Sequence, residues 1–203
     1  MKIIAFGAHP DDIEPQIGGT LAKFSHEGAD VVIVTALSTA TGALSASQRE
    51  LEGRAAADTL GAGSIRLGII PEDFKISREY IGIFDSIIHA EKPNLIFRIG
   101  DMDSHHEHNI VYECVRSAAR KNSCSLISLS QALPGGIGRH QYDFFSDISR
   151  FEKVKREAIL KYESQIEKYG MEWVDAIIAR DKHWGFNIGV NSAEAAFIDK
   201  WIV

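Results

Sequence analysis

The sequence KIIAFGAHPDD, residues 2–12, places an apolar run directly before a histidine, a proline and two aspartates. Residues 2–8 show no alternation of apolar and polar side chains, which is typical of a strand buried on both faces of a parallel sheet. A run this short that leads into charged residues, with no small-residue cleavage site, does not resemble a signal peptide. We therefore predict a first, central strand with polar chemistry at its carboxyl end.

Strand and helix patterns alternate along the rest of the chain. Apolar runs predict strands at 30–37, 65–69, 95–97 and 125–129, and helical spacing predicts helices at about 15–28, 47–60, 77–90 and 109–121. From Phe151 onward the pattern is helical. This alternation predicts an α/β fold: one Rossmann-like domain over residues 1–203, with a doubly wound, mostly parallel sheet flanked by helices.

Two polar segments, residues 9–12 and the HHEH run at 105–108, follow the first and fourth predicted strands. In the common strand order 3-2-1-4-5 these strands are neighbours, and ligands bind beyond their carboxyl ends. We therefore expect the two segments to face each other and to form an active site there. A glycine-rich loop at residues 134–138 is predicted to lie over this site.

The composition excludes several classes of partner. A net charge of −6 and a pI of about 5.7 leave no basic stripe for nucleic acid. No apolar run approaches the roughly 20 residues that span a bilayer. Cys114 and Cys124 are too few for a disulfide framework and predict a cytoplasmic protein. We expect a small-molecule partner, and the sequence is compatible with a homo-oligomer.

The residue types in the two polar segments suit a catalytic metal site. Such a site takes three ligands from histidine and carboxylate side chains and keeps one position open. His9, with Asp11 or Asp12, and one or two of the histidines at 105, 106 and 108 supply such a set. The second aspartate then provides a base for a water molecule. If 105–108 opens a helix, residues 105 and 108 share a face, whereas residue 106 is rotated by roughly 100°.

Each segment also has an ordinary structural interpretation. The two aspartates could cap the following helix. The histidine run could be a solvated turn, and the charged residues 49–54 could be a solvated helix face with local ion pairs. Only the convergence of both polar segments at neighbouring strand ends favours a metal site over these interpretations.

The sequence argues against one alternative to a metal hydrolase and leaves another open. A nucleotide-binding oxidoreductase needs a Gly-x-Gly-x-x-Gly turn where this chain has residues 9–12, HPDD. A catalytically inactive binding protein of the same fold stays open, because a fold does not dictate activity.

These motifs together resemble those of the LmbE-like deacetylases, the PIG-L family of the N-acetylglucosaminyl-phosphatidylinositol de-N-acetylase. The resemblance covers nearly the whole chain. It rests on residues 8–14, AHPDDIE, on GGTL at 18–21, on the arginine-bearing helix at 49–61, on 103–108, and on Ser164-Gln165. It implies removal of the N-acetyl group from an N-acetylglucosamine-type amino sugar or its conjugate. The alternatives are a zinc hydrolase of a different N-acyl substrate and a catalytically inactive sugar-binding protein of the same fold.

The resemblance also implies a role for individual residues. His9, Asp12 and His108 would bind Zn²⁺, with another divalent ion such as Fe²⁺ as the alternative. Asp11 would be the general base. His105 would stabilise the oxyanion and help to protonate the leaving amine.

Two further roles follow from the same resemblance. Arg49 would contact a substrate hydroxyl or phosphate, and Glu107 would orient the ring of His105. The family usually has proline where this chain has His106 and aspartate where it has Glu107. The extra methylene of Glu107 is expected to shift the ring that it holds.

Overall fold

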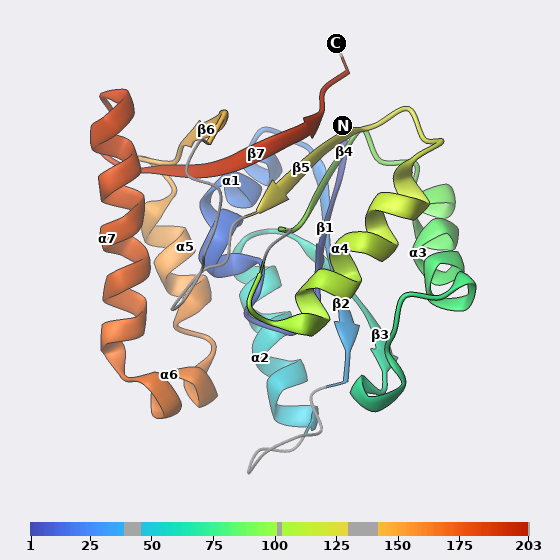
Figure 1. The fold of residues 1–203 in the computed structure, drawn as a ribbon. Coiled ribbons are helices and arrows are strands. Elements are labelled where there is room, and N and C mark those ends of the chain that lie inside the picture. Colours follow the sequence, from blue (N-terminus) through green and yellow to red (C-terminus); the bar gives the residue numbers. More distant parts are fainter. Residues whose placement is uncertain (39–45, 101–102, 130–141, 203) are drawn as a thin grey trace.

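The computed structural model describes residues 1–38, 46–100, 103–129 and 142–202 (Figure 1). Its sheet has seven strands in the order β3-β2-β1-β4-β5-β7-β6. The strands are β1 Lys2–Gly7, β2 Asp30–Leu37, β3 Gly63–Ile69, β4 Leu95–Ile99, β5 Ser125–Leu129, β6 Phe144–Asp147 and β7 Ala193–Lys200. The α-helices are α1 Glu14–His26, α2 Ala46–Thr59, α3 Arg78–Glu91, α4 His106–Ala119, α5 Glu152–Ile159, α6 Glu163–Tyr169 and α7 Met171–Ile188, and Pro71–Asp73 forms the 3-10 turn η1.

Strand β1 lies at the centre of the parallel part of the sheet, as predicted. It pairs in parallel with β2 on one side and with β4 on the other. Its side chains alternate between two cores: Ile4 and Phe6 belong to one, and Ile3 and Ala5 to the other. All four are fully buried, which explains why this strand shows no alternation of apolar and polar residues.

The two cores lie on opposite faces of the sheet. One contains Phe84 of α3 and Val111 of α4, and the other contains Leu21 of α1 and Ala56 of α2. Figure 1 shows α3 and α4 together on one side of the sheet, with α1, α2 and α5 on the other. The doubly wound class and the order of the first five strands are therefore confirmed.

The prediction of continuous helix from Phe151 onward is wrong at its end. Three helices extend to Ile188, but residues 193–200 form β7, which pairs antiparallel with β5 and with β6. The sequence of this strand, AEAAFIDK, contains residues that favour helices. Pairing with the open edge of β5 outweighs that preference, since strand formation depends on tertiary context.

Some expectations concern other parts of the chain. The glycine-rich loop at 134–138 lies outside the described residues. Both cysteines are free thiols buried in the core that contains Phe84. No helix in the described ranges combines the length and apolar character needed to cross a membrane.

Candidate active site

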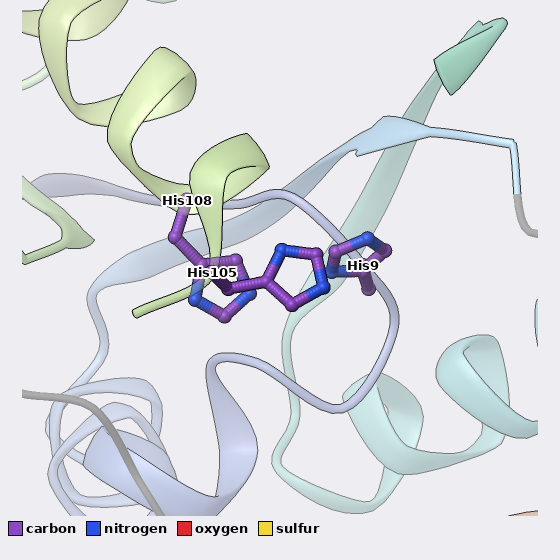
Figure 2. A group of neighbouring side chains, drawn as sticks. All are labelled: His9, His105 and His108. Atoms are coloured by element: carbon purple, nitrogen blue, oxygen red, sulfur yellow. The ribbon is translucent and has the colours of Figure 1, made fainter. Parts of the chain in front are cut away.

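Three histidines gather where β1 and β4 end. His9 follows β1, whereas His105 and His108 lie at the start of α4, directly after the β4 loop. Figure 2 shows the three rings facing one another. The ring centroids lie 4.9 Å apart for His9 and His105, 5.4 Å for His9 and His108, and 4.7 Å for His105 and His108. One potential ligand atom from each lies within 4.8 Å of the others, so this histidine cluster could hold a metal ion.

Asp12 does not cap the following helix. The residue at the N-cap of α1 is Ile13, which makes no side-chain cap. Asp12 instead turns back toward β1, and its Oδ2 accepts hydrogen bonds of 2.7 Å from the backbone N–H groups of Ala8 and His9. The other oxygen, Oδ1, lies 3.1 Å from His108 Nε2. The capping interpretation is therefore wrong for Asp12, whose carboxylate connects the two polar segments.

Asp103 fixes the ring of His108. Its Oδ2 lies 2.7 Å from His108 Nδ1, and its Oδ1 accepts a hydrogen bond of 2.8 Å from the backbone N–H of His105. A carboxylate on the far nitrogen of a histidine is the usual support of a metal ligand. Asp103 lies in the 103–108 motif but was not among the predicted site residues. Its position after a strand, five residues before a candidate ligand, could have indicated this role.

Glu107 contacts two histidines. Its Oε2 lies 2.8 Å from His9 Nε2 and 3.5 Å from His105 Nδ1. The closer partner is therefore His9, whereas the resemblance implied His105. The longer side chain of glutamate accounts for the difference, because one extra methylene extends the carboxylate across to the β1 loop.

His106 lies outside the cluster. Helix α4 begins at His106, with His105 at the N-cap position. The His106 side chain is exposed and its ring stacks on the outer side of His105 at 5.7 Å, whereas His108 is buried. The geometry thus agrees with the expected split between residues 105 and 108 on one side and residue 106 on the other.

The charges of the site favour a cation. Burial lowers the pKa of His108, but the charges and hydrogen bonds of Asp12 and Asp103 outweigh burial and raise it to about 10. Burial likewise opposes protonation of His9, but Asp12 raises the pKa of His9 overall. Burial and the neighbouring histidines lower the pKa of His105. Burial raises the pKa of Asp12, but the charges of His108 and His9 outweigh burial and hold this pKa well below its usual range. The carboxylates thus favour positive charge between them, which a divalent metal would also supply.

Asp11 points its carboxylate toward the start of α2. Its φ of 86° is in the left-handed region, which is uncommon for a residue other than glycine. Arg49 Nη2 donates a hydrogen bond of 2.8 Å to Asp11 Oδ1 and another of 3.1 Å to the carbonyl of Pro10. Burial raises the pKa of Asp11 to about 7, although the charge of Arg49 opposes this shift. A carboxyl group that titrates near neutrality is suited to general base catalysis.

Arg49 is therefore not merely part of a solvated helix face. Its neighbour Glu52 is buried and accepts hydrogen bonds from Ser164, 2.5 Å from the hydroxyl and 3.0 Å from the backbone N–H. In the same segment, the hydroxyl of Tyr162 donates a hydrogen bond of 2.7 Å to Glu14 Oε1. The start of α6 is thus fastened to both α1 and α2, next to Asp11.

The donor set fits zinc. One oxygen of Asp12 is occupied by two N–H groups, and the far nitrogens of His108 and His9 are held by Asp103 and Glu107. The atoms left for a metal are nitrogen and carboxylate oxygen, the usual ligands of catalytic zinc, and no thiolate lies among them. A doubly wound sheet with such a cluster beyond β1 and β4 defines the class of a candidate metal-dependent hydrolase.

Comparison with known proteins identifies the family. The family described as GlcNAc-PI de-N-acetylase (PIG-L) matches residues 4–119, more than half of the chain. The chain belongs to this family. It is accordingly an N-deacetylase, a hydrolase that cleaves the linear C–N bond of an amide.

Individual relatives support the family and the fold. The diacetylchitobiose deacetylase of Thermococcus kodakarensis is 26% identical over 186 residues, 81% of this chain and 70% of the relative. The structure of N,N'-diacetylchitobiose deacetylase from Pyrococcus horikoshii is similar to this chain with a TM-score of 0.83 and 22% identity. The match covers 98% of this chain and 84% of the Pyrococcus chain.

The fold alone does not decide the reaction. The structure of GalB, the 4-carboxy-2-hydroxymuconate hydratase from Pseudomonas putida, has a TM-score of 0.82 at 17% identity and covers 100% of this chain and 97% of its own. The same sheet therefore carries chemistry other than deacetylation. The reaction must be argued from the family match and from the site.

Proposed function

We propose that this chain is a zinc-dependent hydrolase that removes the N-acetyl group from an N-acetylglucosamine-type amino sugar or its conjugate. One observation carries the proposal. Asp12 Oδ1 and His108 Nε2 lie 3.1 Å apart beside His9. The other oxygen of Asp12 accepts backbone hydrogen bonds, and the other ring nitrogen of His108 is paired with Asp103, so Oδ1 and Nε2 are the atoms available to a metal. These ligands lie next to Asp11, a carboxylate that could serve as a base.

We assign the metal to His9, Asp12 and His108. Because Glu107 holds Nε2 of His9 and Asp103 holds Nδ1 of His108, the opposite nitrogen of each ring is available as a ligand. His105 is the most exposed member of the histidine cluster, with 46% of its side chain accessible. A group that meets substrate must be accessible, which supports a role for His105 beside the reacting amide instead of in the ligand set.

The residues divide the reaction between them. Bound zinc would supply Lewis acidity to the amide carbonyl and to the attacking water. The water oxygen forms a bond to the carbonyl carbon, and Asp11 accepts a proton from that water. A ring N–H of His105 would donate a hydrogen bond to the developing oxyanion. The C–N bond then breaks, the amine nitrogen receives a proton from Asp11 or His105, and the products are acetate and the free amine.

Arg49 has a different immediate partner from the one that the resemblance implied. Its Nη2 is engaged by Asp11 and Pro10, which supports a role in holding the base. Contact between Arg49 and a substrate hydroxyl or phosphate stays a prediction.

We also propose where the enzyme acts and what it binds. Cys114 and Cys124 are unpaired and buried, which supports a reducing compartment such as the cytoplasm. The expected partner is a small amino sugar, and assembly into a homo-oligomer stays a prediction. The alternatives are hydrolysis of another N-acyl compound and sugar binding without catalysis.

A substrate screen tests this function. Metal-free protein is loaded with Zn²⁺ or Fe²⁺ and incubated with N-acetylglucosamine, diacetylchitobiose, N-acetylglucosamine conjugates and N-acyl compounds that lack a sugar. We expect amine release from a sugar substrate, loss of release on chelation, and recovery with zinc. Release only from sugar-free compounds would favour the other N-acyl hydrolase. Sugar binding without amine release under any metal would favour the inactive protein.

A further inference from the structure

Gln165 meets both Asp11 and Arg49. The hydrogen-bond network assigns the orientation of its amide: the nitrogen donates to Asp11 Oδ2 at 3.1 Å, and the oxygen accepts from Arg49 Nη1 at 2.7 Å. Arg49 Nη2 in turn donates to Asp11 Oδ1 at 2.8 Å. The three side chains thus close a ring of hydrogen bonds, which we call the Gln165 clamp.

The clamp holds both oxygens of Asp11 from the side of α2 and α6. An amide is suited to this place because it donates to a carboxylate and accepts from a guanidinium at the same time. A second carboxylate at residue 165 would repel Asp11, and an apolar side chain would remove one hydrogen bond from Asp11 Oδ2 and one from Arg49 Nη1. Gln165 as a residue is only 4% exposed, so it is not placed to meet substrate.

The neighbouring residues deliver Gln165 to this position. Ser164 fastens the first turn of α6 to Glu52 of α2, and Tyr162 fastens it to Glu14 of α1. These anchors do not touch the carboxylate of Asp11. Ser164→Ala removes the hydroxyl bond to Glu52 but keeps the bond from the backbone N–H, and the Tyr162 anchor remains, so this variant loses a buried hydrogen bond outside the clamp and serves as its control.

We propose that Gln165 is a positioning residue of the deacetylase, which fixes the carboxylate of Asp11 together with Arg49 in the orientation that accepts a proton. The proposal rests on the proposed function of Asp11 as the base. Asp11 lies in the turn between β1 and α1 with its backbone in the left-handed region. A residue in such an uncommon conformation depends on its surroundings to hold it, and the clamp supplies these contacts. A small displacement of a reacting group lowers turnover strongly, whereas substrate binding elsewhere is preserved.

The test compares Gln165→Met, which keeps the length of the side chain, with Ser164→Ala. On the substrate that the wild-type enzyme hydrolyses, we expect Gln165→Met to lower kcat by about tenfold or more, with KM and zinc content within about twofold of wild type. Ser164→Ala should keep kcat within about threefold. An equal loss of kcat in the two variants, or a change of Gln165→Met confined to KM or zinc content, would overturn the proposal.

The dependence on Asp11 is tested with Asp11→Asn. If Gln165 acts through Asp11, adding Gln165→Met to Asp11→Asn should lower kcat by less than about twofold more. Independent losses that multiply would contradict the proposal.

An unfolding experiment keeps this result separate from the substrate assignment. In urea, Asp11→Asn and Gln165→Met should couple by at least about threefold in the unfolding equilibrium constant, whereas Asp11→Asn and Ser164→Ala should not. If the wild type releases no amine but this coupling is present, the proposed function fails and the clamp stands. Absence of the coupling overturns the clamp whatever the activity.

Discussion

Two clusters of buried carboxylates in this molecule are neutralised in different ways. In the C-terminal region, Lys155 Nζ lies 2.5 Å from Asp181 Oδ2 and 2.7 Å from Glu194 Oε1, and all three side chains are fully buried. At the carboxyl ends of β1 and β4, the ion-pair partners of Asp12 and Asp103 within the described part of the chain are histidines. Histidine carries a charge only when protonated, so the second cluster can exchange its protons for a metal. The lysine is therefore a permanent structural cation, whereas the histidine site can bind a metal cation in place of its protons.

The lysine cluster of Lys155, Asp181 and Glu194 also contacts the glycine-threonine segment of α1. Glu194 of β7 accepts hydrogen bonds from the backbone N–H groups of Gly19 and Thr20, at 2.9 and 2.7 Å. A Cβ at Gly19 would lie within 2.9 Å of Ile148 side-chain atoms, so glycine at this position lets α1 pack against Ile148. The same carboxylate therefore ties the last strand to the helix that follows the histidine-bearing loop.

The largest expected effect is loss of the metal. His108→Ala should lose most of the bound zinc and lower the deacetylase rate by about a thousandfold or more, because it removes a proposed ligand. His106→Ala, its matched control, should keep zinc and rate within about twofold of wild type. Zinc content and amine release measure both variants. Retention of zinc by His108→Ala together with its loss from His106→Ala would contradict the ligand assignment.

His105→Ala separates the two roles within the histidine cluster. It should keep zinc but lower kcat by about a hundredfold, the usual cost of losing an oxyanion donor. Metal analysis and steady-state rates on the same preparation distinguish this outcome from a ligand role. Loss of zinc from His105→Ala would make the three histidines the ligand set, which their spacing also permits.

The lysine cluster should respond in stability instead of chemistry. Lys155→Met removes the cation that lies between the buried carboxylates of Asp181 and Glu194. Asp181 keeps Arg180 at 3.1 Å, but Glu194 loses its ion pair with Lys155, and the free energy of unfolding should fall by about 3–5 kcal/mol. Lys153→Met on the same helix removes a side chain that is 89% exposed and should change it by less than about 0.5 kcal/mol. Urea denaturation compares the two. Equal effects would show that Lys155 is not the structural cation of this cluster.

A smaller effect is expected where the two regions meet, at Glu14 and Tyr162. Burial raises the pKa of Glu14 from 4.5 to about 7. The folded state then binds this proton more tightly than the unfolded state, so the stability that it contributes is present below about pH 4.5 and is lost as the pH rises toward 7. Glu14→Gln should flatten this dependence by on the order of 1–3 kcal/mol. Glu27→Gln, at an exposed site in the turn after α1, should leave the curve as in wild type, and a wild-type slope in Glu14→Gln would refute the linkage.

The central part of the fold could be predicted because its sequence pattern depends directly on burial. The apolar run of β1 is buried on both faces, and the order of the parallel strands follows from the alternation with helices. Strand β7 could not be predicted in this way, because its alanines, glutamate and lysine favour a helix until the edge of β5 is available.

The residue types of the site were predictable, but their pairwise contacts were not. Sequence spacing brought residues 9–12 and 105–108 to one edge of the sheet. It could not assign Glu107 to His9 or Arg49 to Asp11, since these contacts depend on side-chain length and on the angle of α2. Gln165 was visible only as half of a serine-glutamine pair, 154 positions after Asp11 in the sequence, and only the packing of α6 gives it a partner.

The most direct test of the account is Asp11→Asn in protein loaded with zinc, with zinc content and kcat measured on the same preparation. The account predicts about one zinc per chain, as in wild type, and a fall in kcat of about a hundredfold or more, because an amide cannot accept the proton of water. Loss of zinc would make Asp11 a ligand, and an unchanged kcat would show that it is not the base. Either result would contradict the division of work between Asp11 and Asp12 on which the proposed function rests.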